Sequence, residues 1–180
     1  MKKPILLDRI PENQRVVALD VSSTVTGWAT VKRAKGVNIV EDFGAIRPPK
    51  HWEADRRISY MVDHLHERAV TRQTPPIRVV MEWQSHMRAA GARNINGLAV
   101  LGKAQGCIYQ HLADLGVHVD RVSEREWTHS WKKERRAELI RLLCVEYRKA
   151  VETDPGLDTG LDIADAIGIG YWRLDQKGGP

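Results

Sequence analysis

Cysteine is scarce in this 180-residue chain, which contains only Cys107 and Cys144. The two lie far apart, and each falls within an apolar helical pattern, so the sequence shows neither a disulfide framework nor the spacing of a zinc site. The one closely spaced histidine pair, His64 and His66, would point to different sides of a helix and makes a poor metal site. We therefore expect both cysteines to be small buried side chains in a reducing compartment.

Long hydrophobic runs are also lacking. No apolar stretch approaches the ~20 residues that span a bilayer. The basic first residues are followed by a short apolar segment at 5–7, which is too short for the core of a signal peptide. These absences predict a cytoplasmic protein with no membrane partner.

The charge balance is mildly basic, because 28 Lys and Arg residues face 23 Asp and Glu residues and give a net charge of +5. This favours an acidic partner such as nucleic acid, although a solvated basic surface explains the excess equally well. The length suits one domain with a sizeable core. We predict a single domain over residues 15–174, with an N-terminal tail at 1–14 and a C-terminal tail at 175–180.

Hydrophobic patterns predict five strands and several helices. The expected strands are 16–19, 27–32, 37–46, 79–81 and 117–119. The expected helices are 53–71, 98–115, a segment through Ile140, Leu143, Cys144 and Tyr147, and 163–172. Gly36 marks a hairpin turn, Gly116 a helix end, and Ser123 an N-cap with Glu126 at capping-box spacing. Early hairpins followed by strand–helix alternation predict an α/β fold with a mixed five-stranded sheet flanked by helices.

Four acidic residues stand where this fold would gather them. Asp20 ends the first strand, Glu82 ends the fourth, and Asp162 and Asp165 lie three apart at the start of the last helix. Converging carboxylates repel one another, and their oxygen atoms select Mg²⁺ or Mn²⁺. Two such ions, about 3.5–4 Å apart, would activate a water molecule and stabilise the leaving oxygen in phosphodiester hydrolysis.

Each acidic residue also has a structural explanation when taken alone. Asp20 suits a turn after a buried strand, and Asp165 suits the N-terminal end of a helix dipole. Asp162 fits the last position of a capping box that begins at Thr159. The argument for a metal site therefore depends on the ordered set and its structural context, and not on any single residue.

These motifs together resemble the RuvC-type Holliday junction resolvases, from about Arg15 to Trp172. The segment 17–28 is similar to that family's opening strand with its catalytic aspartate and Ser/Thr-Gly turn. The other similar segments are 44–47, 79–82, 96–106 and the closing Asp-x-Ala-Asp-Ala helix at 162–170.

The resemblance implies a ribonuclease-H-like fold and a homodimer that makes paired nicks in four-way junction DNA with two Mg²⁺ or Mn²⁺ ions at each active site. Asp20, Glu82, Asp162 and Asp165 would be the catalytic metal ligands. The family also uses lysines before and within the penultimate helix, so Lys132 and Lys133 are candidates to stabilise phosphate charge.

The sequence departs from the bacterial enzymes in the loop after Glu82, which is several residues longer. Trp83, Met87, Arg88 and Arg93 in this loop would enter an opened junction and hold phosphates, and a flexible surface loop is the alternative. We also assign Lys103, in the following helix, to DNA binding. Such divergence suits a phage-type member, acting in the cytoplasm of a bacterium or of a phage-infected host cell.

Three other functions remain open at this point. A related nuclease of the same fold would cut forks, flaps or RNA–DNA hybrids with the same metal chemistry. A non-catalytic junction-binding module would keep the fold without cleavage. Asp20 with Ser22, Ser23 and Thr24 also resembles the phosphate loop of sugar kinases and actin-like ATPases, but those enzymes need two such domains around the nucleotide.

Overall fold

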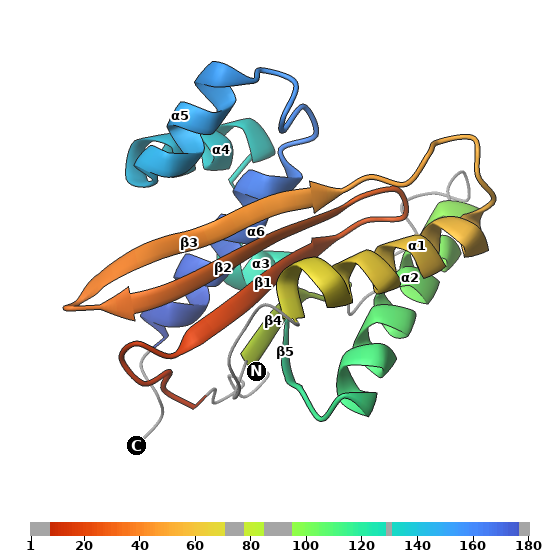
Figure 1. The fold of residues 1–180 in the computed structure, drawn as a ribbon, viewed down its shortest axis with the longest axis horizontal. Helices are drawn as coiled ribbons and strands as arrows, with labels where there is room; N and C mark the ends of the chain where they lie inside the picture. Colours follow the sequence, from red (N-terminus) through yellow and green to blue (C-terminus); the bar gives the residue numbers. More distant parts are fainter. Residues whose placement is uncertain (1–7, 71–77, 85–94, 129–130, 177–180) are drawn as a thin grey trace.

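The computed structural model describes residues 8–70, 78–84, 95–128 and 131–176, and its centre is one mixed five-stranded sheet (Figure 1). The strands are β1 (Arg15–Val21), β2 (Thr26–Ala34), β3 (Val37–Ile46), β4 (Arg78–Glu82) and β5 (His118–Val122). Their order is β3-β2-β1-β4-β5. The first three strands run antiparallel, whereas β1, β4 and β5 are parallel. The predicted fold class and sheet are confirmed.

Helices cover both faces of the sheet (Figure 1). α1 (Ala54–Leu65), which continues into a short π-helix (His66–Val70), and α2 (Ile95–Asp114) cover one face. α6 (Asp162–Asp175) covers the other, and α4 (Lys133–Leu143) packs on it. The remaining helices are α3 (Glu124–Thr128) and α5 (Val145–Thr153).

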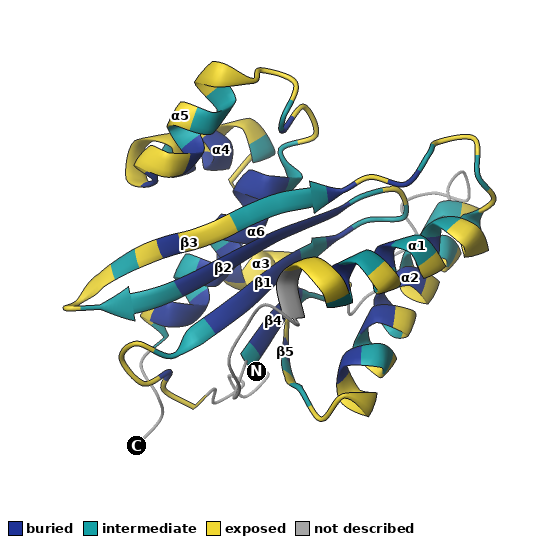
Figure 2. Cartoon of the chain, in the orientation of Figure 1, coloured by how far each residue is buried: buried dark blue, intermediate teal, exposed yellow. Residues whose placement is uncertain are grey.

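Strand alternation divides the core into two layers. Val16 and Ala18 of β1 pack in the layer beneath α6, whereas Val17 and Leu19 pack beneath α1 and α2. Successive side chains of a strand point to opposite faces, so the buried sheet needs apolar residues at every position. Figure 2 shows the resulting buried centre of β1 and the exposed outer side of α1.

Local turn chemistry sets the chain reversals. Lys35 and Gly36 both have positive φ, 52° and 76°, between β2 and β3, as the tight hairpin turns that match strand twist require. Gly116 has φ 72° just after α2. The Ser123 backbone N–H and hydroxyl both donate to Glu126 Oε2, at 2.6 and 2.7 Å, so the predicted start signal does precede a helix.

The region between β5 and α6 differs from the prediction, which had one helix through Ile140, Leu143, Cys144 and Tyr147. Cys144 has an extended backbone, φ −116° and ψ 102°, and separates α4 from α5. It also begins α5, because its sulfur accepts a hydrogen bond from the Tyr147 N–H at 3.4 Å. The break lets Cys144 and Tyr147 reach the core while Leu143 points to solvent.

The expected burial of the cysteines is half right. Cys144 is buried, as predicted, but Cys107 is exposed, because it lies on the solvent side of α2, whose Ala104 and Ile108 face the sheet. Part of the predicted N-terminal tail packs on the domain, since Ile10 is buried and Arg173 donates to the Asp8 carbonyl at 2.7 Å. None of the helices within the described ranges is both long and apolar enough to cross a membrane.

Candidate active site

Asp20 and Glu82 reach the same side of the sheet because of strand alternation. Val16 and Ala18 of β1, and Val80 of β4, face α6. Asp20 and Glu82 continue these two rows at even spacing, and the two strands run parallel as neighbours with Leu19 beside Met81. Their carboxyl groups therefore emerge at adjoining strand ends, beneath the start of α6.

Gly27 allows the first turn of α6 to come close to the strand ends. It pairs with Asp20 across β1 and β2. A β-carbon at residue 27 would lie 2.1 Å from the backbone oxygen of Asp162, which is closer than real atoms approach. The absence of a side chain at Gly27 thus places Asp162 beside the strand that carries Asp20.

The alternative explanation of Asp162, a capping box that begins at Thr159, does not hold. The residue before α6 is Leu161, which has a left-handed backbone with φ 59° and no side-chain cap. Asp158 caps the helix instead: its carboxylate accepts the backbone N–H groups of Ile163 and Ala164 at 3.0 and 2.9 Å, and the Tyr147 hydroxyl at 2.7 Å. Asp162, which has no capping role here, is left for the site.

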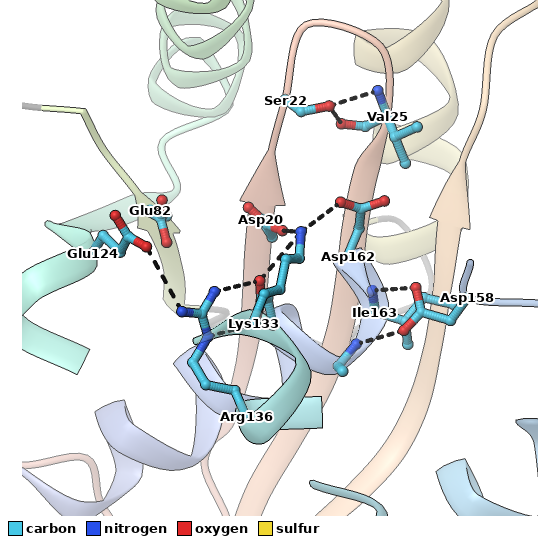
Figure 3. Close-up of polar contacts among 12 residues, drawn as sticks. Asp20, Ser22, Val25, Glu82, Glu124, Lys133, Arg136, Asp158, Asp162 and Ile163 are labelled. Atoms are coloured by element: carbon cyan, nitrogen blue, oxygen red, sulfur yellow. Dashed lines mark hydrogen bonds and ion pairs between the residues drawn. The ribbon is translucent and has the colours of Figure 1, made fainter. Parts of the chain in front are cut away.

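Lys133, at the start of α4, lies at the centre of the acidic group (Figure 3). Its Nζ is 3.0 Å from Asp162 Oδ1, 3.3 Å from Asp165 Oδ2 and 3.6 Å from Asp20 Oδ2. The predicted aspartates therefore converge. Lys132, the other predicted lysine, is exposed at the residue before α4 and lies outside this group of ion pairs.

Burial, together with repulsion between the carboxylates, changes the acidity of Asp20 and Glu82. Burial, and next the Glu82 carboxylate, raise the pKa of Asp20 well above its ordinary value. Burial raises the pKa of Glu82 from 4.5 to about 7, although a hydrogen bond from Trp127 opposes the rise. Burial disfavours the charged form of Lys133, but the surrounding aspartates outweigh it and raise the pKa of its ammonium group.

Two functional candidates were missed in the sequence. Arg136 donates from Nε and Nη2 to the two oxygens of Asp165, both at 2.9 Å, and Trp127 donates from its indole N–H to Glu82 Oε2 at 2.7 Å. Arg136 follows Lys133 by three residues, and residues three apart share a helix face. That spacing was the available signal; no local pattern pointed to Trp127.

The predicted DNA-binding residues are only partly described. Trp83 is half-buried, and its ring meets Tyr109 edge-on, with Arg121 over both rings. Lys103 is exposed and pairs with Asp55, with 2.6 Å between Nζ and Oδ1. Neither contact involves the acidic site. The other three predicted residues, Met87, Arg88 and Arg93, lie outside the described residues.

The acidic group suits a divalent cation in its donor chemistry. Its ligand atoms are carboxylate oxygens, which Mg²⁺ and Mn²⁺ prefer, and it already surrounds a positive charge, the Lys133 ammonium. Within the described ranges, no three Asp, Glu, His or Cys side chains are arranged to hold one metal ion together. Asp20, Glu82, Asp162 and Asp165 fit a metal by type and burial, but they would need to reorganise around it as Lys133 moves aside.

The sheet order, its covering helices and the acidic edge define a ribonuclease-H-like α/β protein. Its structural neighbours with TM-scores above 0.5 include Holliday junction resolvases. The sequence itself matches no protein-family model and no curated sequence. The fold implied by the sequence motifs is therefore confirmed by structure.

Three of these neighbours show how far the likeness extends. RuvC of Thermus thermophilus, solved with a Holliday junction substrate, has a TM-score of 0.60 and 16% identity over 88% of this chain and 92% of that one. The yeast mitochondrial Holliday junction resolvase has a TM-score of 0.60 and 12% identity, over 92% and 82%. The fowlpox virus resolvase, solved with junction DNA, has a TM-score of 0.55 and 14% identity, over 90% and 97%. At these identities the likeness shows a shared fold.

Proposed function

We propose that this protein is a structure-selective DNA endonuclease that resolves four-way junctions by metal-dependent paired nicking. The main observation in support is that Asp20, Asp162 and Asp165 converge on Lys133, with Glu82 at the end of the neighbouring strand. Structural neighbours that are themselves junction resolvases support this substrate over others. A binding module without catalysis would have no use for four mutually repelling, largely buried acidic groups.

The proposed roles follow from the chemistry of each group. Asp20, Glu82, Asp162 and Asp165 would hold Mg²⁺ or Mn²⁺, two ions per site, which lower the pKa of a bound water and stabilise the leaving oxygen. Lys133, displaced from the centre of the carboxylates, would supply a positive charge beside the metal ions, suited to a non-bridging phosphate oxygen. Trp83 and Lys103, with Met87, Arg88 and Arg93, are proposed to contact DNA, and a homodimer would present two such sites to the junction.

The decisive test is cleavage of a labelled four-way junction in Mg²⁺ or Mn²⁺, beside linear duplex, fork and RNA–DNA hybrid. We expect paired nicks confined to the junction. Cleavage mainly of the hybrid or fork would keep the metal site and reject the resolvase role. Tight junction binding without cleavage would favour the binding module.

Variants connect the activity to the site. Asp20→Asn and Glu82→Gln should each lower the cleavage rate by about 100-fold or more, because metal ligation contributes several kcal/mol to transition-state stabilisation. Junction binding in the presence of chelator should persist. Asp63→Asn, an exposed aspartate on α1, is the matched control. Retained cleavage in the Asp162→Asn, Asp165→Asn double variant would overturn the metal-site assignment.

A further inference from the structure

The acidic site is backed by a chain of contacts that joins the strand glutamate to the helix aspartate. The Trp127 indole N–H donates to Glu82 Oε2. The Arg136 guanidinium carbon lies 4.8 Å from the centroid of the Trp127 ring, and the guanidinium donates two hydrogen bonds to the Asp165 carboxylate. This pair comes from α3 and α4, whereas the carboxylates come from β4 and α6. These contacts therefore connect β4, α3, α4 and α6, and they fix the distances between side chains that are far apart in the sequence.

Trp127 is held firmly enough to orient Glu82. Its side chain is 7% exposed and packs in the core with Ile140. Gly168 of α6 faces the ring closely, because a β-carbon there would lie 3.1 Å from the indole. The main chain of Glu82 is fixed separately, since its carbonyl accepts the Gln105 side-chain amide at 3.1 Å. Hydrogen bonds therefore hold Glu82 both at its backbone carbonyl and at its side-chain carboxylate.

Arg136 is equally constrained. It is 8% exposed, and besides Asp165 it donates from Nη1 to the Trp131 carbonyl at 2.7 Å and lies 3.7 Å from Glu124 Oε1 (Figure 3). Two parallel N–H bonds to one carboxylate fix both its position and the plane of the group. A lysine at this position keeps the charge but does not reproduce this geometry.

Resting on the proposed function, we propose that Trp127 and Arg136 are positioning residues that hold Glu82 and Asp165 in place for a shared divalent metal centre. Each acts through a carboxylate and touches neither metal nor DNA. Partners that orient metal ligands in this way affect metal affinity when they are removed. The consequence is that the α3–α4 segment, and not only the strand ends and α6, determines how well the site binds metal.

Trp127→Phe isolates the hydrogen bond, because phenylalanine keeps an aromatic ring against Arg136 and loses the indole donor. We expect Mn²⁺ affinity, measured by titration calorimetry without DNA, to fall about 10-fold. Trp131→Phe, on a Trp that touches the site only through its backbone carbonyl, should bind Mn²⁺ like the wild type. Equal Mn²⁺ affinity in Trp127→Phe and the wild type overturns the role of Trp127.

Arg136→Lys and Arg136→Met distinguish the positioning of Asp165 by Arg136 from the effect of the Arg136 charge. If Arg136 positions Asp165, Arg136→Lys weakens Mn²⁺ binding although the charge is kept. If Arg136 acts by charge alone, Arg136→Lys binds like the wild type and Arg136→Met binds more tightly, since a repelling cation has gone; that result overturns the proposal for Arg136. Arg135→Lys, on the exposed side of α4, is the matched control.

A metal-free measurement covers the case in which Trp127→Phe does not fold. The indole N–H resonance of Trp127, observed in the nitrogen-15-labelled full chain with chelator, should move when Glu82→Gln removes the charged acceptor. An unmoved resonance overturns the contact. The proposed function fails separately: a folded wild type that binds no Mn²⁺ and cuts no junction rejects the metal centre itself, whereas normal wild-type behaviour with unaffected variants rejects only the positioning roles.

Discussion

Asp20 and Glu82 are held in surroundings that favour their protonated forms, because burial and mutual repulsion both act against the charge. When these carboxyl groups are ionised they repel one another, and a bound divalent cation would offset that repulsion. Lys133 relieves part of it within the chain, by its ion pairs with Asp162, Asp165 and Asp20.

The raised pKa values predict that the free energy of unfolding of the metal-free protein depends on pH. The pKa of Glu82 is about 7 in the folded state against 4.5 ordinarily, so the folded state binds the extra proton more tightly. Its contribution to stability is complete below pH 4.5 and is lost as pH rises through 7, with an upper limit of about 3 kcal/mol. The raised pKa of Asp20 acts in the same direction.

The measurement is urea unfolding of the wild type and Glu82→Gln in chelator, at pH 5 and pH 8. The free energy of unfolding should fall from pH 5 to pH 8 by more in the wild type than in Glu82→Gln. Glu152→Gln, an exposed glutamate on α5, should follow the wild type. Parallel pH profiles for the wild type and Glu82→Gln would contradict the assigned environment of Glu82.

At the scale of elements, the start of α6 is the part that positions the site, and Asp158 holds it. The Asp158 carboxylate is almost fully buried and satisfies two helix N–H groups and the Tyr147 hydroxyl. Asp158→Ala would leave these buried donors without an acceptor, so we expect a loss of about 2–4 kcal/mol in the free energy of unfolding.

Thr159→Ala provides the matched comparison, because the alternative explanation of Asp162 has a cap at Thr159, whereas the structure has it one residue earlier, at Asp158. Thr159 is exposed, so its replacement should change stability by less than about 0.5 kcal/mol. Denaturant unfolding of both variants decides between the two positions. A larger loss in Thr159→Ala than in Asp158→Ala would restore the capping box.

The contact between β2 and α6 gives a second prediction at this scale. Gly27→Ala places a methyl group against the Asp162 backbone, so α6 must move away from β2. We expect a stability loss of about 1–3 kcal/mol and a fall in junction cleavage of up to about 100-fold, because displacements near 1 Å disturb catalytic geometry.

Gly102→Ala on α2 is the control for Gly27→Ala, since a β-carbon there meets open space. It should leave cleavage unchanged and raise stability by about 0.5–1 kcal/mol, through the higher helix propensity of alanine. Thermal unfolding and the junction assay measure both variants. Full activity and stability in Gly27→Ala would show that the start of α6 tolerates displacement.

At the scale of the whole molecule, paired nicking requires two sites on one junction, and the described part of one chain offers one acidic site. We therefore expect a homodimer with twice the monomer mass by light scattering. A mixed dimer of wild-type and Asp20→Asn subunits, purified through two different tags, should nick one strand of a cruciform plasmid and leave an open circle, whereas the wild type yields linear DNA. Linear product from the mixed dimer at the wild-type level would contradict one site per subunit.

Strand positions and the acidic set were readable from the sequence because they depend on local pattern. The alternation of β1 and β4 places Asp20 and Glu82 on the α6 face by parity alone, and the spacing of Asp162 and Asp165 places both on one side of a helix. The turn at Gly36 and the end of α2 just before Gly116 followed from backbone conformations that glycine adopts readily.

What lay beyond the sequence was every contact between side chains from distant elements. The break at Cys144, the cap from Asp158, and the reach of Trp127 and Arg136 to Glu82 and Asp165 depend on how α3, α4 and α5 pack against α6. The sequence by itself determined the mixed sheet and which carboxylates share its edge, since hydrophobic periodicity is local. Only the tertiary structure decided which cations and donors hold them, because long polar side chains bond to whatever packing brings within about 3 Å.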